Sequence, residues 1–129
     1  MTTAKSALIL FAHGSRDPDW AAPFRTLQAQ VAAKQAGLTV QLAFLEIMRP
    51  SLIEVVNELV EGGTRRAIVA PLFMAQGAHL KRDLAGTIES LRERHKELTI
   101  EVLPALGEVD IVMDAMSTWL ANSAAISAH

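Results

Sequence analysis

Apolar positions along the chain follow two kinds of pattern. Short runs of aliphatic and β-branched residues predict strands at 6–12, 39–45, 67–73 and 99–103. Because these runs contain little polar alternation, they are typical of strands that are covered on both faces, as in a parallel sheet. Between the runs, apolar residues recur every three or four positions, which predicts amphipathic helices.

Helix boundaries are marked by local signals. Trp20, Phe24, Leu27 and Val31 predict a first helix that Gly37 ends, and the second stripe is Leu52, Val55, Val56 and Leu59. Ser51 and Glu54 can form a capping box after Pro50, and Gly62 and Gly63 stop this helix. The third stripe is Leu80, Leu84, Ile88 and Leu91, and the fourth, opened by Glu108, is Val109, Val112, Met113, Met116 and Leu120.

The element order is therefore βαβαβαβα. Right-handed crossovers and short connections turn this order into an α/β fold, a three-layer sandwich with a parallel four-stranded sheet. No linker or internal repeat divides the chain, so we expect one domain over residues 1–129. The tail at 122–129 has small residues and no periodic stripe, and it is expected to fray.

Composition narrows the possible functions. The chain has 129 residues, half of them hydrophobic, no cysteine and a formal net charge of −2. Without cysteine there are no disulfides, thiolate nucleophiles or sulfur-ligated metals. The charge and the few aromatic residues argue against nucleic acid as a partner. The apolar run near the N-terminus is too short to span a membrane, so we expect a cytoplasmic protein.

Candidate chemistry collects where the predicted strands end. His13, Glu46 and His79 follow the first, second and third strands. In open parallel sheets, ligands bind beyond the carboxyl ends of the strands, so these side chains are expected at one edge. Two imidazoles and a carboxylate suit a divalent metal site with open positions. Each residue also has a structural interpretation: either histidine can hydrogen-bond a loop, and Glu46 can pair with Arg49.

Several other side chains belong to the same predicted edge. Four basic residues there could hold an anionic substrate, although such residues are commonly ordinary solvated charges: Arg16, Arg49, Lys81 and Arg82. Met48, Phe73 and Met74 could form an apolar floor under a flat ligand, or could simply belong to the core. His95 and His129 lie elsewhere in the chain.

The sequence resembles a known family at these positions. The segments that carry the resemblance are FAHGSRDP at 11–18, AFLE at 43–46 with Pro50 and Ser51, and PLFM at 71–74 with Gly77, Ala78, His79 and Asp83. In this order they are similar to the short-form sirohydrochlorin chelatases of the CbiX type. The loop at 74–76, Met-Ala-Gln, departs from the more glycine-rich or aliphatic loop of many relatives.

The resemblance has concrete implications. It implies a chelatase-like fold (one flavodoxin-like half) and insertion of Co²⁺, Fe²⁺ or, in some archaeal members, Ni²⁺ into sirohydrochlorin or a close relative. The products lead to cobalamin, sirohaem or the nickel cofactor. The family's metal-binding histidines carry over onto His13 and His79, and its strand-end glutamate onto Glu46. The metal is a substrate, no organic cofactor is needed, and the short form implies a homodimer that covers both faces of the macrocycle.

Two other functions remain open from the sequence. A metal- or tetrapyrrole-binding carrier would use the same histidines without catalysing insertion. An unrelated flavodoxin-like regulatory domain would bind no metal, and it would be favoured if His13 and His79 lay far apart. The fourth helix is also open: the apolar face of Met113, Met116, Trp119 and Leu120 either packs on the sheet or contacts a second copy.

Overall fold

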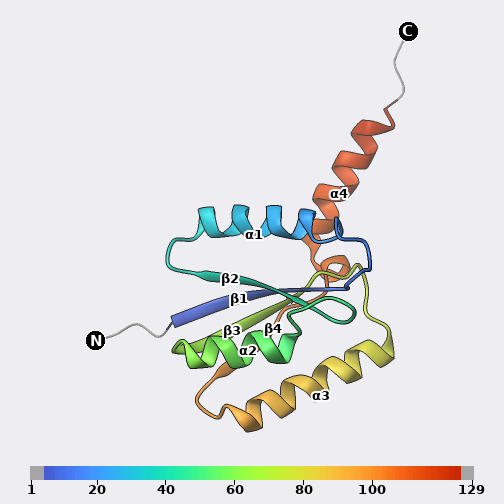
Figure 1. Ribbon diagram of the computed structural model, residues 1–129. Coiled ribbons are helices and arrows are strands. Elements are labelled where there is room, and N and C mark those ends of the chain that lie inside the picture. The colour runs from blue at the N-terminus through green and yellow to red at the C-terminus, as the bar shows by residue number, and fades with distance from the viewer. Residues whose placement is uncertain (1–4, 126–129) are drawn as a thin grey trace.

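The computed structural model, described here for residues 5–125, contains a parallel sheet with the strand order β2-β1-β3-β4 (Figure 1). The strands are Lys5–Ala12 (β1), Thr39–Phe44 (β2), Thr64–Pro71 (β3) and Thr99–Val102 (β4). The helices are Ala22–Lys34 (α1), Leu52–Glu61 (α2), Ala78–Arg94 (α3) and Asp110–Ser123 (α4), with a short 3₁₀ helix at Leu106–Glu108 (η1). The predicted α/β class, element order and parallel sheet are confirmed.

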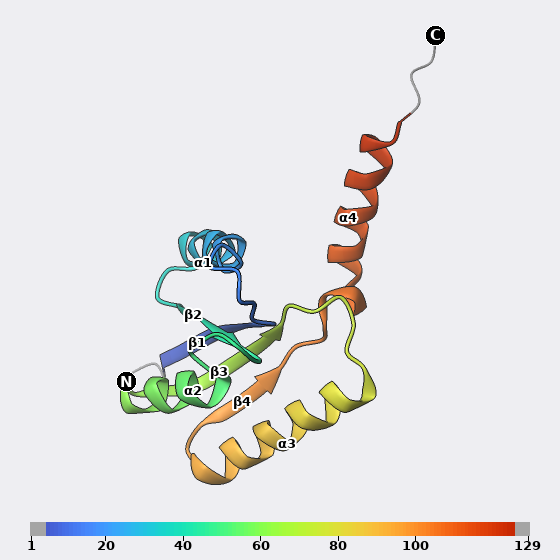
Figure 2. The ribbon, with the colours of Figure 1, turned by 45° about the vertical axis from the view of Figure 1, so that its right-hand side comes forward.

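The two faces of the sheet are covered unequally. Helix α1 lies on one face, and α2 and α3 lie on the other (Figures 1 and 2). The main core is on the α2–α3 side, where Ile9, Val56 and Val69 are fully buried. A smaller cluster of Ala12, Ala21 and Phe44 packs under α1. Alternate strand residues point to opposite faces, so β1 and β2 contribute to both clusters, whereas β3 and β4 contribute only to the main core.

The predicted helix signals are mostly confirmed, with one shift. Ser51 Oγ accepts a hydrogen bond from the Glu54 backbone N–H (3.2 Å), and the Glu54 carboxylate accepts one from the Ser51 N–H (3.0 Å), which completes the capping box. Trp20, in contrast, is not helical. Helix α1 begins two residues later because Pro23 favours the first helical turn.

The fourth helix departs from the prediction. Glu108 ends η1 and does not open α4, whose N-cap is Val109, and no residue of α4 is buried. Instead of forming part of a complete third layer, α4 projects away from the sheet in both ribbon views. Asn122 and Ser123, expected in a frayed tail, are helical; 126–129 lie outside the described residues. None of the helices within 5–125 combines the length and apolar character needed to cross a membrane.

Candidate metal centre

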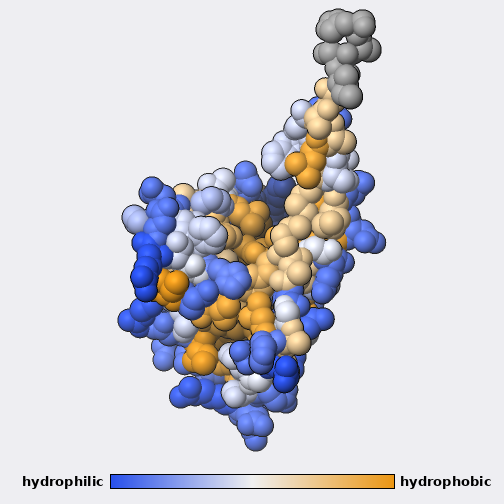
Figure 3. Space-filling view, turned by 90° about the vertical axis from the view of Figure 1, so that its right-hand side faces the viewer, coloured by the Kyte–Doolittle hydropathy of each residue, from blue (hydrophilic) through white to orange (hydrophobic). Residues whose placement is uncertain are grey.

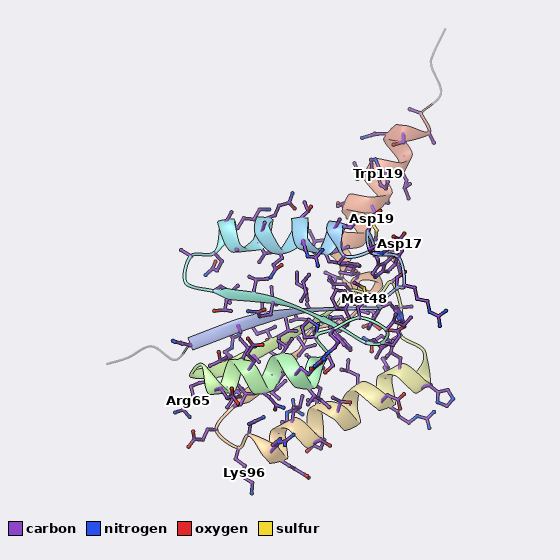
Figure 4. The ribbon with its side chains drawn as sticks, in the orientation of Figure 1. Asp17, Asp19, Met48, Arg65, Lys96 and Trp119 are labelled. Carbon is purple, nitrogen blue, oxygen red and sulfur yellow. The ribbon has the colours of Figure 1, made fainter. Side chains whose placement is uncertain are left out.

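The loops after β1, β2 and β3 meet at the carboxyl edge of the sheet. The Leu45 N–H donates to the Ala12 carbonyl (2.8 Å), and the Leu72 N–H donates to the Phe11 carbonyl (2.7 Å). These bonds continue the strand pairing past the strands and hold the loops side by side. In Figure 4, Asp17 and Met48 lie at this edge, whereas Arg65 lies near the opposite end.

His13 and Glu46 are the predicted site residues that the fold brings into contact. His13 Nδ1 lies 2.9 Å from Glu46 Oε1, and the Gly14 backbone N–H donates to Glu46 Oε2 (3.3 Å). About half of each side chain is exposed, 50% for His13 and 44% for Glu46. A carboxylate on one ring nitrogen fixes the tautomer and orientation of an imidazole, which leaves Nε2 as the nitrogen for a metal.

Two aromatic residues complete the support of His13. The rings of His13 and Phe73 are in contact, with centroids 4.6 Å apart and planes inclined at 55°, and Phe73 itself is buried. The Trp20 indole N–H donates to the His13 carbonyl (2.6 Å). The sequence pattern assigned Trp20 to a helical stripe, and nothing in the spacing of the two residues signals this hydrogen bond.

The segment after β2 forms a tight turn that positions Glu46. Ile47 has a φ of 71°, and the Met48 N–H donates to the Glu46 carbonyl (2.7 Å). This is a γ-turn with positive φ, a rare conformation for a β-branched residue that costs about 1–3 kcal/mol. Gly14 packs directly on the turn, because a Cβ at that position would lie only 1.9 Å from the Glu46 carbonyl oxygen.

His79 follows β3, as the sequence predicts, but it belongs to a helix. It is exposed in the first turn of α3, not on a loop. Within residues 5–125, no group of three or more His, Cys, Asp or Glu side chains is arranged to hold a metal. The structure therefore joins His13 and Glu46 into a pair but does not gather His13, Glu46 and His79 into one cluster.

Comparison with known proteins identifies the family of the chain. A family model described as CbiX matches residues 7–123. The chain belongs to the CbiX family. The sirohydrochlorin cobaltochelatase of Methanocaldococcus jannaschii is 35% identical over 90 residues, which cover 70% of this chain and 63% of that protein. The sirohydrochlorin cobaltochelatase of Saccharolobus islandicus is 30% identical over 78% of this chain and 81% of that protein.

Solved structures agree on the fold. The CbiX protein of Marinobacter aquaeolei VT8 has a TM-score of 0.78 at 30% identity, and the match covers 92% of this chain and 96% of that chain. SirB from Bacillus subtilis, solved with Fe³⁺, has a TM-score of 0.77 at 21% identity, and this chain covers 48% of it. The chain also spans less than two thirds of the first relatives, 63% and 55% of their lengths.

The predicted basic residues of this CbiX protein fall into two groups. Arg49 forms an ion pair with Glu54, which raises the pKa of the guanidinium, and the Arg49 hydrogen bond is the main reason that the pKa of Glu54 is lowered to about 2. Lys81 Nζ lies 4.0 Å from Glu108 Oε1. Arg16 and Arg82 are exposed and form no ion pair within residues 5–125.

A small apolar cavity opens next to the Glu46 turn. Its volume is about 140 Å³, and Leu45, Leu52, Ile53 and Asp83 are among the residues that line it. Figure 3 shows that apolar side chains gather over this side of the molecule and extend onto α4. The cavity is smaller than the 300–1,000 Å³ usual for small-molecule pockets, so it is too small to enclose a macrocycle.

Proposed function

We propose that this CbiX protein is a chelatase of the lyase class that inserts a divalent metal into sirohydrochlorin or a related tetrapyrrole. The observation that carries the proposal is the hydrogen bond between His13 and Glu46, which leaves one imidazole nitrogen available at the carboxyl edge of the sheet. Its relatives named sirohydrochlorin cobaltochelatase support the substrate class. Co²⁺ or Fe²⁺ is the metal substrate we favour, with Ni²⁺ as a further candidate, and the product would feed cobalamin or sirohaem synthesis.

In this proposal His13 and Glu46 act as a unit. His13 Nε2 binds the incoming ion, while Glu46 holds Nδ1 and keeps the ring oriented. Insertion releases two pyrrole protons, and an imidazole that has given up its metal can accept one of them. Glu46, which the sequence offers as a metal ligand, is here assigned mainly to orienting His13, because both of its oxygens already have hydrogen-bond partners.

His79 is proposed as the second metal ligand, from the first turn of α3. Imidazole ligands without thiolates suit Co²⁺, Fe²⁺ and Ni²⁺. The carboxylates of the macrocycle would pair with Arg16 and Arg82, since Arg49 and Lys81 already have acidic neighbours. Guanidinium groups form the strongest such contacts because they can bind carboxylate in a bidentate manner. No organic cofactor is needed for these steps.

We also propose that residues 1–129 are one chelatase-like domain that acts as a homodimer in the cytoplasm. Ligand sites bury most of their ligand's surface, and one edge of this sheet offers a wall to only one face of a flat macrocycle. A second copy related by a twofold axis would supply the other wall, and such closed dimers are the commonest oligomers.

The test is anaerobic incubation of the purified protein with sirohydrochlorin and Co²⁺, Fe²⁺ or Ni²⁺, followed by the absorbance change of the macrocycle. His13→Ala and His79→Ala should each lower the rate by at least about 100-fold, as loss of a metal ligand would. His95→Ala is the matched control, because His95 bonds Asn57 (2.7 Å) away from this edge and its loss should leave the rate near wild type.

Three results would contradict parts of the proposal. Near-wild-type rates in both His13→Ala and His79→Ala would refute the metal site. Metal binding measured by calorimetry without any insertion would favour the carrier function over the enzyme. If neither Co²⁺, Fe²⁺ nor Ni²⁺ binds to the folded wild-type protein, the regulatory-domain alternative would replace both.

A further inference from the structure

Helix α4 carries an apolar face that contacts little of its own chain. Met113, Trp119 and Leu120 are 42%, 67% and 57% exposed. Figures 1 and 2 both show the helix projecting from the body, and in Figure 4 Trp119 lies well away from the sheet. Monomeric proteins rarely leave such a continuous apolar face in water, so another surface is expected to cover it.

The direction of α4 is fixed by the connection that precedes it. Ala105 is fully buried, the Leu106 N–H donates to the Phe73 carbonyl (2.9 Å), and the Gly107 N–H donates to the Met74 carbonyl (2.9 Å). Gly107 lies so close that a Cβ there would be 2.0 Å from the Met74 oxygen. Because η1 is held against the loop after β3, α4 leaves the body along a defined path.

The sheet has a matching region with no helix over it. On the side of α1, the half-buried Leu8, Ile68 and Ala70 lie side by side on β1 and β3, and Leu103 follows β4. An ion pair between Arg66 and Glu101 borders this apolar area on the same face, further from the carboxyl edge. Helix α1 packs over β2, and no second helix lies on this side of the sheet among residues 5–125. The opposite face has two helices, α2 and α3.

We infer that α4 of each copy packs across the uncovered β1–β3–β4 face of a second copy, so that two chains exchange their last helices. This inference rests on the homodimer of the proposed function and names its contact surface. Each chain has one helix that projects from its body and one area of sheet without a helix. In a dimer, the projecting helix of each copy can cover that area on the other copy. The same patch then serves both subunits, as twofold symmetry requires.

The dimensions agree with this exchange. Fourteen helical residues span about 21 Å. The three strands of the uncovered face, at about 4.8 Å spacing, span roughly 10 Å, so α4 is long enough to cross them. Along α4, Met113, Met116, Trp119 and Leu120 recur at helical spacing and form the single apolar stripe that such packing needs.

Cysteine cross-linking tests the exchange directly, because the chain has no cysteine of its own. Ala70→Cys places a thiol on the uncovered face, and Met116→Cys places one mid-way along α4. When the two variants are mixed, one carrying an affinity tag that shifts its size, a short bismaleimide should give a cross-linked pair of one tagged and one untagged chain. Met116→Cys mixed with Glu93→Cys, on the exposed side of α3, should not cross-link.

Sedimentation of the purified protein over a range of concentrations provides the second test, because it measures the dissociation constant of the dimer. Trp119→Glu should raise the dimer dissociation constant by at least about 30-fold, as loss of a tryptophan at the centre of an interface does. Thr118→Glu, which adds the same charge to the exposed side of α4 opposite Met113, Met116 and Leu120, should leave the constant near wild type. A wild-type dimer that cross-links is the expected result.

The outcomes separate this inference from the proposed function. A wild-type dimer that neither cross-links through these positions nor responds to Trp119→Glu would overturn the exchange and leave the homodimer standing. In the Ala70→Cys and Met116→Cys double variant, a cross-link only within one chain would show that α4 folds back, which also overturns it. A wild-type monomer would refute both, whereas the chelatase assay with His13→Ala tests the metal site independently.

Discussion

Replacing Gly14 by alanine tests whether close backbone packing positions His13 and Glu46 in the candidate metal centre. A Cβ at residue 14 would lie 1.9 Å from the Glu46 carbonyl oxygen, and real Cβ contacts almost never fall below 3.0 Å. The two loops must therefore separate by at least about 1.1 Å. Such a shift carries the 2.9 Å contact between His13 and Glu46 beyond hydrogen-bonding range.

The expected magnitudes follow from that separation. Overpacking of this kind costs about 1–3 kcal/mol of unfolding free energy. For a chain of this size each kcal/mol lowers the melting temperature by about 4 °C, so Gly14→Ala should melt about 4–12 °C lower. Loss of an orienting partner typically weakens metal binding by about 10–100-fold. Differential scanning calorimetry and titration calorimetry with Co²⁺ measure the two effects.

A matched glycine provides the control. Gly86 lies within α3, and a Cβ there would meet nothing within 4 Å. Gly86→Ala should stabilise the protein by about 1 kcal/mol through helix propensity and leave Co²⁺ affinity unchanged. If Gly14→Ala melted like wild type and bound Co²⁺ equally well, the close approach of Gly14 to the Glu46 turn would not position the site, and our reasoning would be wrong.

Three further changes probe other parts of the structure. Ile47→Asn should raise the unfolding free energy by about 1 kcal/mol in urea titrations, because asparagine tolerates positive φ better than isoleucine does; an unchanged or lower value would argue against strain in the turn. Glu54→Gln should lower the stability of the protein above pH 4.5, because the folded-state pKa of Glu54 is lowered to about 2. Wild type loses this stability as the pH falls through about 2, so the two proteins should converge there. Acid unfolding curves that coincide at every pH would contradict this. Ile9→Ala should cost about 2–5 kcal/mol, since Ile9 is fully buried between the sheet and the α2–α3 layer, and a loss below 1 kcal/mol would contradict that burial.

The sequence was sufficient to predict the elements whose signals are local. The capping box of Ser51 and Glu54 marks the start of α2, and the α3 stripe, of which Leu84, Ile88 and Leu91 are buried, identifies the face that α3 turns to the core. The proximity of His13 and Glu46 also follows from sequence, because each ends one of two strands that become neighbours in a parallel sheet. Periodicity and strand ends are properties of short segments, so one sequence is enough to read them.

Other features depend on contacts between segments that are far apart in the chain. The hydrogen bond from the Trp20 indole to the His13 carbonyl and the turn at Ile47 have no pattern in the sequence, because they are set by how three loops pack at one edge. The position of His79 within a helix depends on where α3 begins, at Gly77. The apolar stripe of α4 was visible, but its spacing does not reveal which surface covers it.

The candidate metal centre and the direction of α4 both depend on one structural element, the loop after β3. The ring of Phe73 contacts the His13 ring (centroids 4.6 Å apart), while the Phe73 backbone carbonyl accepts a hydrogen bond from the Leu106 N–H (2.9 Å) at the start of η1. The next carbonyl, that of Met74, holds Gly107. Because Phe73 is buried and packs edge-on against Phe11, it cannot move toward solvent without opening the core. A displacement of this loop therefore alters both the packing on His13 and the direction of α4. One rigid segment thus supports the candidate ligand and, in the proposed dimer, sets the direction of the helix that contacts the second copy.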